Sequence, residues 1–170
     1  MVDKKSTSNV VEQNEKTFVW KKHESENSNH RPSSREGFVF SYMQDKKKFI
    51  LLGGISHVRY SDIYTLCALT WKWSKILCKG ESPKDVCYCA SWYDCPNLYV
   101  SVKEVSNQET YILDTDCWEW YKLFTLETLD PRFHHTAVKL PNQSEAIVFG
   151  GFGVKQNKCL NDINKLDYSK

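Results

Sequence analysis

Three cysteines lie close together in the middle of this 170-residue sequence, where thiolates could hold a metal ion. Cys87 and Cys89 flank Tyr88, and Cys95 follows shortly after. In an extended strand the first two cysteines would point to the same side. Zinc knuckles separate each ligand pair by two residues, however, and no second Cys/His pair has matching spacing. We therefore interpret these thiols as small core side chains.

A second polar group could suggest a carboxylate–histidine metal set. It contains Glu127, Asp130 and His134, and His135 follows directly. Such spacing suits a helix, but Pro131 favours a turn that enters a strand. We expect the two histidines to be a hydrogen-bonded structural pair.

The sequence shows no pattern typical of nucleotide binding or nucleophilic catalysis. Gly150-Gly151-Phe152-Gly153 follows a strand-like segment but opens no helix, so it fails the structural condition for a dinucleotide fingerprint. No serine-nucleophile elbow or kinase motif occurs. We therefore expect a non-enzymatic protein that needs no cofactor and no metal.

Composition narrows the classes of partner. The chain has 23 Lys+Arg against 21 Asp+Glu, a net charge of +2, which favours neither nucleic acid nor an anionic membrane surface. No apolar run is long enough to span a bilayer, and Met1–Ser6 lacks the apolar core of a signal peptide. We expect the seven cysteines to be reduced and the protein to be cytoplasmic, with the nucleus as the alternative.

The elements that position these residues emerge from internal repetition. The segment Phe49–Gly54 recurs as Ala146–Gly151, 97 residues later. A degraded copy, Asn97–Val102, lies midway, with Ser101 and Val102 in place of the two glycines. This spacing indicates three repeats.

Two further segments repeat in the same order. Asp62–Leu66 is matched by Glu109–Leu113 and by Asn161–Asp167, and Trp71-Lys72-Trp73 is matched by Trp118-Glu119-Trp120. A period of about 48 residues that holds four short β-type segments is typical of a propeller blade.

This pattern resembles the kelch repeat. The first repeat carries it in Pro32, Arg35, Gly37, Gly53, Gly54, Asp62, Tyr64, Leu66 and Trp71 or Trp73; the third in Pro131, Arg132, His134, Gly150, Gly151, Asp162, Leu166 and Asp167. The middle repeat departs most, with Pro83-Lys84 and no glycine pair. The resemblance implies an all-β fold of kelch-type β-propeller blades, each a four-stranded antiparallel sheet. About three blades are expected, an incomplete ring in one chain.

The expected organisation is a polar, disordered tail at residues 1–16 and a propeller segment at 17–168. The repeats span about 31–78, 79–126 and 127–168, and residues 17–22 form a candidate closing strand for the edge at Asn164–Asp167. Four strands are predicted in the first repeat: Gly37–Met43, Phe49–Gly53, Asp62–Leu66 and Trp71–Ile76. The arginine at the start of each repeat is expected to tie adjacent blades.

Three blades are too few to close a ring, because propellers typically have four to eight. Three arrangements remain open. The chain is a fragment or isoform of a longer propeller, two chains build a six-bladed ring, or the short array docks on the blades of another protein.

The loops after the glycine pairs are the expected interaction surface, because loops vary without disturbing the sheets. Basic side chains there favour an acidic peptide or a carboxylate terminus. The candidate partner-binding residues are Arg35, His57, Arg59, Tyr60, Arg132, Phe152 and Lys155.

The resemblance implies a protein–protein interaction module, a scaffold or adaptor. Kelch proteins commonly recruit substrates to cullin-type ubiquitin ligases, although residues 1–30 are too short and polar for a BTB-like or F-box-like region. The alternative is a structural subunit that completes a composite propeller by self-association or with other kelch blades.

Overall fold

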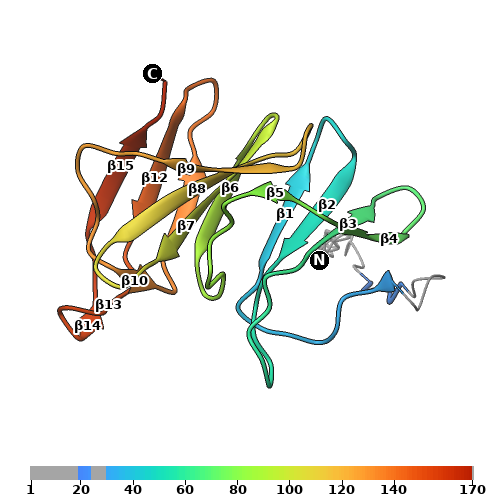
Figure 1. Cartoon of the computed structure of the whole chain (residues 1–170), viewed down its shortest axis with the longest axis horizontal. Coiled ribbons are helices and arrows are strands. Elements are labelled where there is room, and N and C mark those ends of the chain that lie inside the picture. Colours follow the sequence, from blue (N-terminus) through green and yellow to red (C-terminus); the bar gives the residue numbers. More distant parts are fainter. Residues whose placement is uncertain (1–18, 24–29, 170) are drawn as a thin grey trace, which may run out of the picture.

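The computed structural model describes residues 19–23 and 30–169, which contain strands and no helix. Three larger antiparallel sheets stand side by side like a partly opened fan, and none of them closes on itself (Figure 1). We call them sheets 1, 2 and 3 in chain order. The architecture is propeller-like and all-β, as the sequence predicted.

Sheet 1 contains four strands in sequential order. They are β1 (Val39–Met43), β2 (Lys48–Leu52), β3 (Ile63–Cys67) and β4 (Trp73–Ile76). These strands confirm the four predicted segments of the first repeat, with ends displaced by one or two residues. The alternation of the sequence appears as alternating faces, because Val39 and Met43 are buried whereas Phe40 between them is exposed.

Sheet 2 contains four antiparallel strands and one short parallel strand at its outer edge. The strands are β5 (Lys79–Gly80), β6 (Ala90–Asp94), β7 (Asn97–Lys103), β8 (Gln108–Asp114) and β9 (Glu119–Leu123). β5 pairs with β9, so the outer edge of sheet 2 is covered by the chain that arrives from sheet 1.

Sheet 3 has three strands, and a small sheet lies beside it. The strands of sheet 3 are β11 (Thr136–Lys139), β12 (Glu145–Phe149) and β15 (Ile163–Asp167). The small sheet consists of β10 (Arg132–Phe133), β13 (Phe152–Gly153) and β14 (Lys158–Cys159). The first antiparallel strands of the three larger sheets, β1, β6 and β11, lie next to one another, with β6 packed between β1 and β11.

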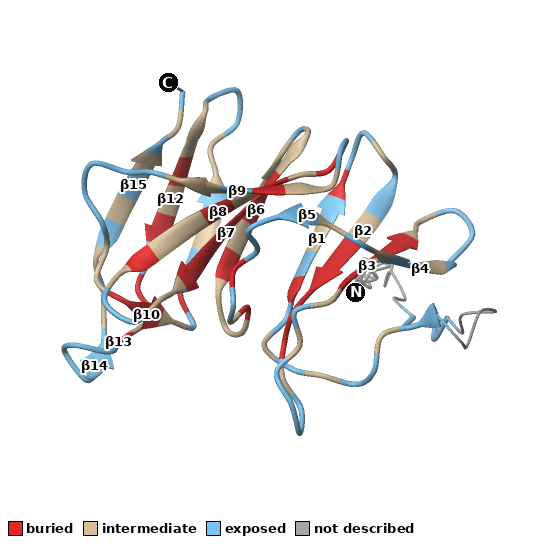
Figure 2. Ribbon diagram, viewed as in Figure 1, coloured by how far each residue is buried: buried red, intermediate tan, exposed pale blue. Residues whose placement is uncertain are grey.

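Two apolar cores hold the sheets together, and in Figure 2 the buried residues concentrate along the central strands. The larger core joins sheets 1 and 2 through side chains such as Ile50, Leu52, Val100 and Leu113. The smaller core joins sheets 2 and 3 around Trp92, whose ring stacks on Tyr99, and Ala146. Each core fills the gap between neighbouring sheets, so the hydrophobic effect acts mainly between repeats.

The glycine pair of sheet 1 adopts the left-handed backbone that glycine tolerates. Gly53 and Gly54 have φ of 68° and 93°. A Cβ on Gly53 would lie 2.2 Å from the carbonyl oxygen of Val86, which belongs to the next repeat. The glycine therefore permits both the turn and the close approach of sheet 2.

The middle repeat keeps its strands, but its register differs by one residue from the sequence alignment. In sheet 1, Leu52 lies opposite Val39, and in sheet 2, Ser101 lies opposite Ala90. Ser101 therefore corresponds to Leu52 rather than to a glycine. Since β7 continues as a regular strand, the positions of the glycine pair are taken by Val102 and Lys103.

The N-terminal segment does not show the predicted pairing. The 1–16 tail and residues 17 and 18 lie outside the described residues. Residues 19–23 form no strand, and the side chain of Trp20 is fully exposed. β15 pairs only with β12 among the described strands, so closure by residues 17–22 stays a prediction. Within the described ranges, no helix could cross a membrane.

Candidate functional site

Arg35 and Arg132 are structural residues in this fold rather than rim residues. The side chain of Arg132 is 3% exposed, and its guanidinium donates to the Gly150 carbonyl and to both carboxylate oxygens of Asp162, at 2.7 and 2.9 Å. Hydrogen bonds from this guanidinium lower the pKa of Asp162 to about 2. The arrangement fixes the glycine turn to the start of β15.

The same contact of a buried arginine with an aspartate and a glycine carbonyl, which we call the clamp, occurs in the first repeat. Arg35 donates to the Gly53 carbonyl at 2.9 Å and to Asp62 at 2.5 Å, and its side chain is 2% exposed. These contacts stay within one repeat, which corrects the expectation that the arginines tie adjacent blades. In the middle repeat, the buried Val86 replaces the arginine.

The sheets are tied at this end by the main chain instead. The amide of Tyr88 donates to the Gly37 carbonyl, and the amide of His134 donates to the Tyr88 carbonyl, both at 2.8 Å. We call this chain of bonds the rim ladder. All three residues have positive φ, between 53° and 63°. This conformation suits glycine but is strained for tyrosine and histidine.

A pocket of about 280 Å³ opens beside the rim ladder. It lies where the loop after β2 meets the entries to β6 and β11, so it combines side chains from all three repeats. The residues that line it are Arg59, Asp85, Cys87, Tyr88, Lys103, Phe133 and His134. We call it the rim pocket.

The aromatic wall of the rim pocket is built around Tyr88. Its ring lies 4.3 Å from that of His134, which in turn contacts Phe133 at 5.1 Å. A Cβ on Gly37 would lie 2.8 Å from the Tyr88 ring, so the first repeat can carry only glycine there. Strained tyrosine and histidine side chains thus line the pocket where glycine would satisfy the backbone.

Arg59 supplies the exposed cation of the pocket. Its Nη1 contacts both oxygens of Asp85 at 2.6 Å and the Cys87 Sγ at 2.8 Å. The Arg59 side chain is 57% exposed, so this ion pair contributes little stability, on the order of 0.5 kcal/mol. A carboxylate from another molecule could therefore replace Asp85 at small cost.

The other two predicted residues of this loop behave differently from each other. Tyr60 stacks over the Arg35 guanidinium at 3.9 Å, and its hydroxyl is 3.0 Å from the Ser56 hydroxyl. This side chain therefore supports the structural clamp. His57 is exposed and does not line the rim pocket.

The third-repeat residues form a neighbouring surface. Phe152 lies in β13, and its ring is 5.3 Å from that of Phe133, which connects it indirectly to the rim pocket. Lys155 pairs with Asp130 at 2.8 Å, and Gln156 donates to the same carboxylate. Of the seven residues predicted to bind a partner, only Arg59 lines the rim pocket.

The residues that sequence reasoning placed elsewhere now define the pocket. Tyr88 forms the wall, and it is not among the residues predicted to bind a partner. Its left-handed backbone also breaks the strand geometry expected for Cys87 and Cys89. Cys87 faces Arg59, whereas Cys89 packs against the larger core.

The cysteines and histidines do not gather into a larger cluster. Within residues 19–23 and 30–169, no three His, Cys, Asp or Glu side chains are placed to hold a metal ion. Burial raises the pKa of the Cys87 thiol to about 11. Neither ring nitrogen of His135 has a hydrogen-bond partner among these residues, which corrects the expected hydrogen-bonded pair.

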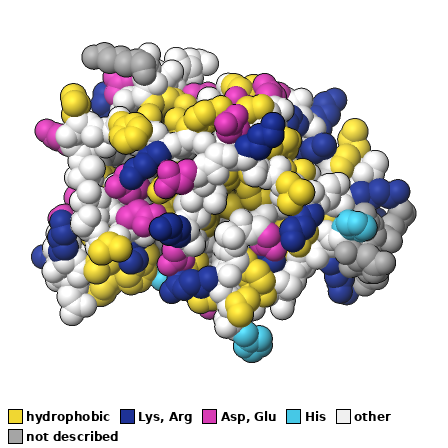
Figure 3. Space-filling model, viewed as in Figure 1, with side chains coloured by type: hydrophobic (Ala, Val, Ile, Leu, Met, Phe, Trp, Pro, Cys, Tyr) yellow, Lys and Arg dark blue, Asp and Glu magenta, His cyan; other side chains and the backbone are white. Residues whose placement is uncertain are grey.

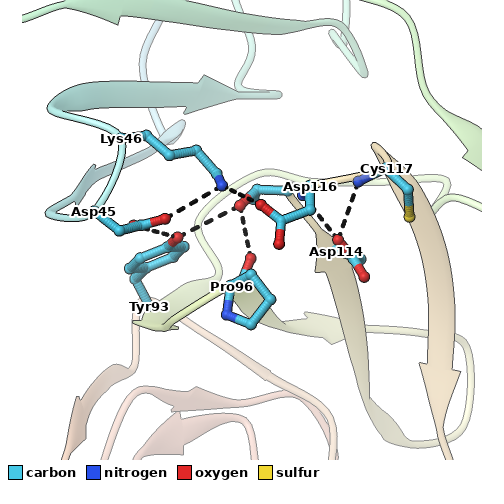
Figure 4. A network of polar contacts seen from close by, with 8 residues as sticks. Asp45, Lys46, Tyr93, Pro96, Asp114, Asp116 and Cys117 are labelled. Atoms are coloured by element: carbon cyan, nitrogen blue, oxygen red, sulfur yellow. Dashed lines mark hydrogen bonds and ion pairs between the residues drawn. The ribbon is translucent and has the colours of Figure 1, made fainter.

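A polar network at the opposite end of β1 and β6 joins sheets 1 and 2 (Figure 4). The Tyr93 hydroxyl donates to Asp45 at 2.7 Å, and Lys46 pairs with Asp116. A more open pocket of about 500 Å³ lies beside it. The polar groups of this network already bond one another, which favours a structural role.

On the face shown in Figure 3, acidic and basic side chains are interspersed.

Comparisons with known proteins identify the fold alone. No protein-family model matches the chain, and no curated protein matches its sequence. Among solved structures, the one titled "Structure of YjhT" is similar, with a TM-score of 0.63 and 11% identity. The match covers 79% of this chain and 50% of that one, which has a β-propeller-like fold. The chain thus spans about half the length of this structural neighbour.

Proposed function

We propose that this chain is a kelch-type interaction module that binds an acidic segment of a protein partner in the rim pocket. The observation that carries the proposal is the strained Tyr88–His134 wall beside a weakly paired Arg59. Strain of this kind in a non-glycine residue marks a position where the side chain has a use. The module would act as a non-enzymatic scaffold or adaptor in the cytoplasm or nucleus.

The chemistry of the pocket defines the ligand. A partner carboxylate takes the place of Asp85 on Arg59, and Lys103 lines the same pocket. An adjacent apolar or aromatic side chain of the partner packs on Tyr88 and Phe133, as at other peptide-binding hot spots. An acidic side chain next to an aromatic one, or a C-terminal carboxylate, meets both requirements.

Selection of displayed random peptides on the full chain tests this proposal. Recovered peptides should combine an acidic group with an apolar neighbour. Arg59→Ala should weaken their binding at least 10-fold, within the range for a charged interface contact. Asp85→Asn should tighten it, because Arg59 loses its internal competitor. Arg31→Ala is the control, since Arg31 is exposed and does not line the rim pocket.

Two results would contradict the proposal: failure to select any peptide, or peptides whose binding ignores Arg59. Affinity capture from native cells, with mass spectrometry, extends the test to whole partners. Recovery of cullin adaptors with the unmodified chain, and of fewer with Arg59→Ala, would assign a substrate-receptor role. Recovery independent of Arg59 would place binding elsewhere.

A second candidate function is that of a structural subunit in a composite propeller. Apolar side chains on the two end faces of the sheet stack favour it. Phe40 on sheet 1 is 49% exposed, and Ile163 on sheet 3 is 71% exposed. Ile63 of sheet 1, which holds the pairing position of Ile163, is buried against sheet 2. This function and the rim pocket are compatible, because they use different surfaces.

A further inference from the structure

The sheet stack ends in two faces that carry apolar side chains. The open face of sheet 1 points away from sheet 2 and includes Phe40, Tyr42, Phe49, Tyr64 and Trp73. Leu51 and Leu66 share this face but are only 6% and 7% exposed in the single chain. The open face of sheet 3 points away from sheet 2 and carries an apolar cluster of Val138, Ile147, Phe149 and Ile163. Polar groups flank this cluster: Thr136, Asp167 and the Lys165–Glu145 ion pair. Phe149 is 47% exposed and Val138 is 60% exposed.

The open face of sheet 1 repeats a face that is buried in sheet 2. Tyr64 lies opposite a lysine in sheet 1, and Tyr111 lies opposite a lysine in sheet 2. Leu66 pairs with Trp73 just as Leu113 pairs with Trp120. The three side chains of sheet 2 are buried in the core shared with sheet 1. The first sheet therefore carries the same residue types for packing against a preceding sheet.

The open face of sheet 3 repeats the other half of that interface. Phe149 lies opposite Ile163, just as Leu52 lies opposite Ile63 in sheet 1. Ile147 occupies the position of Ile50, two residues earlier on the same strand. Leu52, Ile63 and Ile50 are all buried against sheet 2. The two open faces are thus the complementary halves of an interface that already exists inside the chain.

The main chain shows the same complementarity at the rim ladder. Inside the chain, a main-chain carbonyl of each sheet accepts a hydrogen bond from an amide of the next sheet, as Gly37 does from Tyr88 and Tyr88 from His134. The next carbonyl in this series is that of His134. Among the described residues, no backbone amide donates to that carbonyl, and the Gly37 amide has no backbone acceptor. The ladder therefore ends in an acceptor on sheet 3 and a donor on sheet 1.

A second bond of the internal interface leaves another complementary pair. The Gly54 amide donates to the Val86 carbonyl of the next repeat at 2.7 Å. Gly151 holds the position of Gly54 in the third repeat, and Arg35 holds that of Val86 in the first. Neither the Gly151 amide nor the Arg35 carbonyl has a backbone partner among the described residues.

We propose that a second copy of this chain docks head to tail on these faces, so that two copies close a ring of six sheets. The inference rests on the second proposed function and names its partner. The internal interface between sheets 1 and 2 is the template, so sheet 3 of each copy packs on sheet 1 of the other.

The docked arrangement predicts specific contacts. The Gly37 amide of one copy donates to the His134 carbonyl of the other, and the Gly151 amide donates to the Arg35 carbonyl. Phe149 and Ile163 of one copy pack on Tyr64 and Leu66 of the other. Both junctions of the ring are identical, since a two-fold axis relates the copies, and the closed arrangement leaves no open sheet face.

Light scattering after size-exclusion chromatography of the full chain tests the proposal. The expected mass is twice the 19.9 kDa of one chain. Phe40→Arg alters the open face of sheet 1, and Ile163→Arg alters that of sheet 3. Both residues are at least 49% exposed in the single chain, so circular dichroism and thermal melting should show folded variants. Each variant should raise the dissociation constant at least about 100-fold, because it places a charge in an apolar contact.

The control is Leu126→Arg, which changes a fully exposed leucine outside both faces and should leave the dimer intact. Mixing the two face variants gives the decisive result. In the mixed dimer, the unaltered sheet 3 face of the Phe40→Arg chain meets the unaltered sheet 1 face of the Ile163→Arg chain. A one-to-one heterodimer should therefore form although neither variant dimerises alone. A dimer that is disrupted by only one variant would overturn the head-to-tail arrangement.

The remaining outcomes separate this inference from the function on which it rests. A chain that is monomeric alone, but binds a different blade-bearing protein through Phe40 and Ile163, would overturn the second copy and retain the composite subunit. A monomer whose face variants change no association would overturn both.

Discussion

Arg132 and Asp162 meet in a two-pronged contact, with the guanidinium almost fully buried and the carboxylate 43% exposed. The pair joins the start of the third repeat to its last strand, 30 residues later. Arg35 and Asp62 form the same contact in the first repeat. Two distant parts of the first and third repeats are thus held together by an ion pair that the middle repeat lacks.

Replacing Asp162 by Asn should destabilise the protein by about 2 kcal/mol, because Arg132 keeps its buried charge without a partner. Water that reaches the half-exposed carboxylate keeps the loss below that for a fully buried pair. Urea unfolding measures the change, with Glu127→Gln, an exposed carboxylate, as the control. Equal stability of both variants would show that the clamp is dispensable.

The same carboxylate makes stability depend on acid. The pKa of Asp162 is about 2 in the folded chain and 3.8 in the unfolded one, so its stabilising effect is complete above pH 3.8. It is lost as the pH falls through 2. Comparison of acid unfolding between the unmodified chain and Asp162→Asn isolates this contribution, which should vanish in the variant.

His135 should add a second pH dependence at milder acidity. Burial lowers the pKa of its imidazole to about 4, from 6.5 in the unfolded chain. The unfolded state therefore binds the proton first, and stability falls as the pH drops from 6.5 to 4, by roughly 3 kcal/mol. His135→Phe should flatten this part of the curve, since Phe38 holds the equivalent position in the first repeat. Parallel curves for both proteins would contradict the assignment.

Gly53 and Gly150 allow a matched test of packing between sheets. Their φ values are nearly equal, 68° and 62°, so alanine costs each about 1 kcal/mol through backbone strain. A Cβ at Gly53 would lie 2.2 Å from the Val86 carbonyl, whereas at Gly150 the nearest atom is 3.0 Å away. Gly53→Ala should therefore be the more destabilising in urea unfolding of the dilute monomer. The reverse order would show that Val86 yields easily.

The Tyr93–Asp45 bond should contribute about 1 kcal/mol to the contact between sheets 1 and 2. A double-mutant cycle with Tyr93→Phe and Asp45→Asn measures the coupling. Additive effects would mean that the bond contributes no net stability. Tyr99→Phe serves as the control, because its ring lies in the other core.

The sequence predicted the sheet architecture well because the repeat signals have strict local causes. The glycine pair requires left-handed backbone, and the hydrophobic alternation of Phe38–Tyr42 requires a strand. Both signals remain in the first repeat, so its four strands were placed within two residues. The middle repeat lacks the arginine and the glycines, and its alignment slipped by one residue.

The candidate site was harder to predict because it depends on contacts between repeats. Arg35 and Tyr60 looked like exposed loop residues, and only the structure reveals that one is buried beneath the other. Tyr88 carries no local sign of left-handed backbone, which arises from the ladder bonds on both sides. Side chains such as Phe133 reach the pocket through folding of the third repeat. No pattern within a single repeat contains that information.

The rim ladder is made of main-chain atoms, and glycine, tyrosine and histidine occupy its three positions. Peptide bonds recognise one another without regard to side chains, so the same main-chain bond of 2.8 Å forms from Tyr88 to Gly37 and from His134 to Tyr88. The spacing of the sheets at this end is therefore set by the backbone, while the side chains of Tyr88 and His134 remain available to shape the pocket.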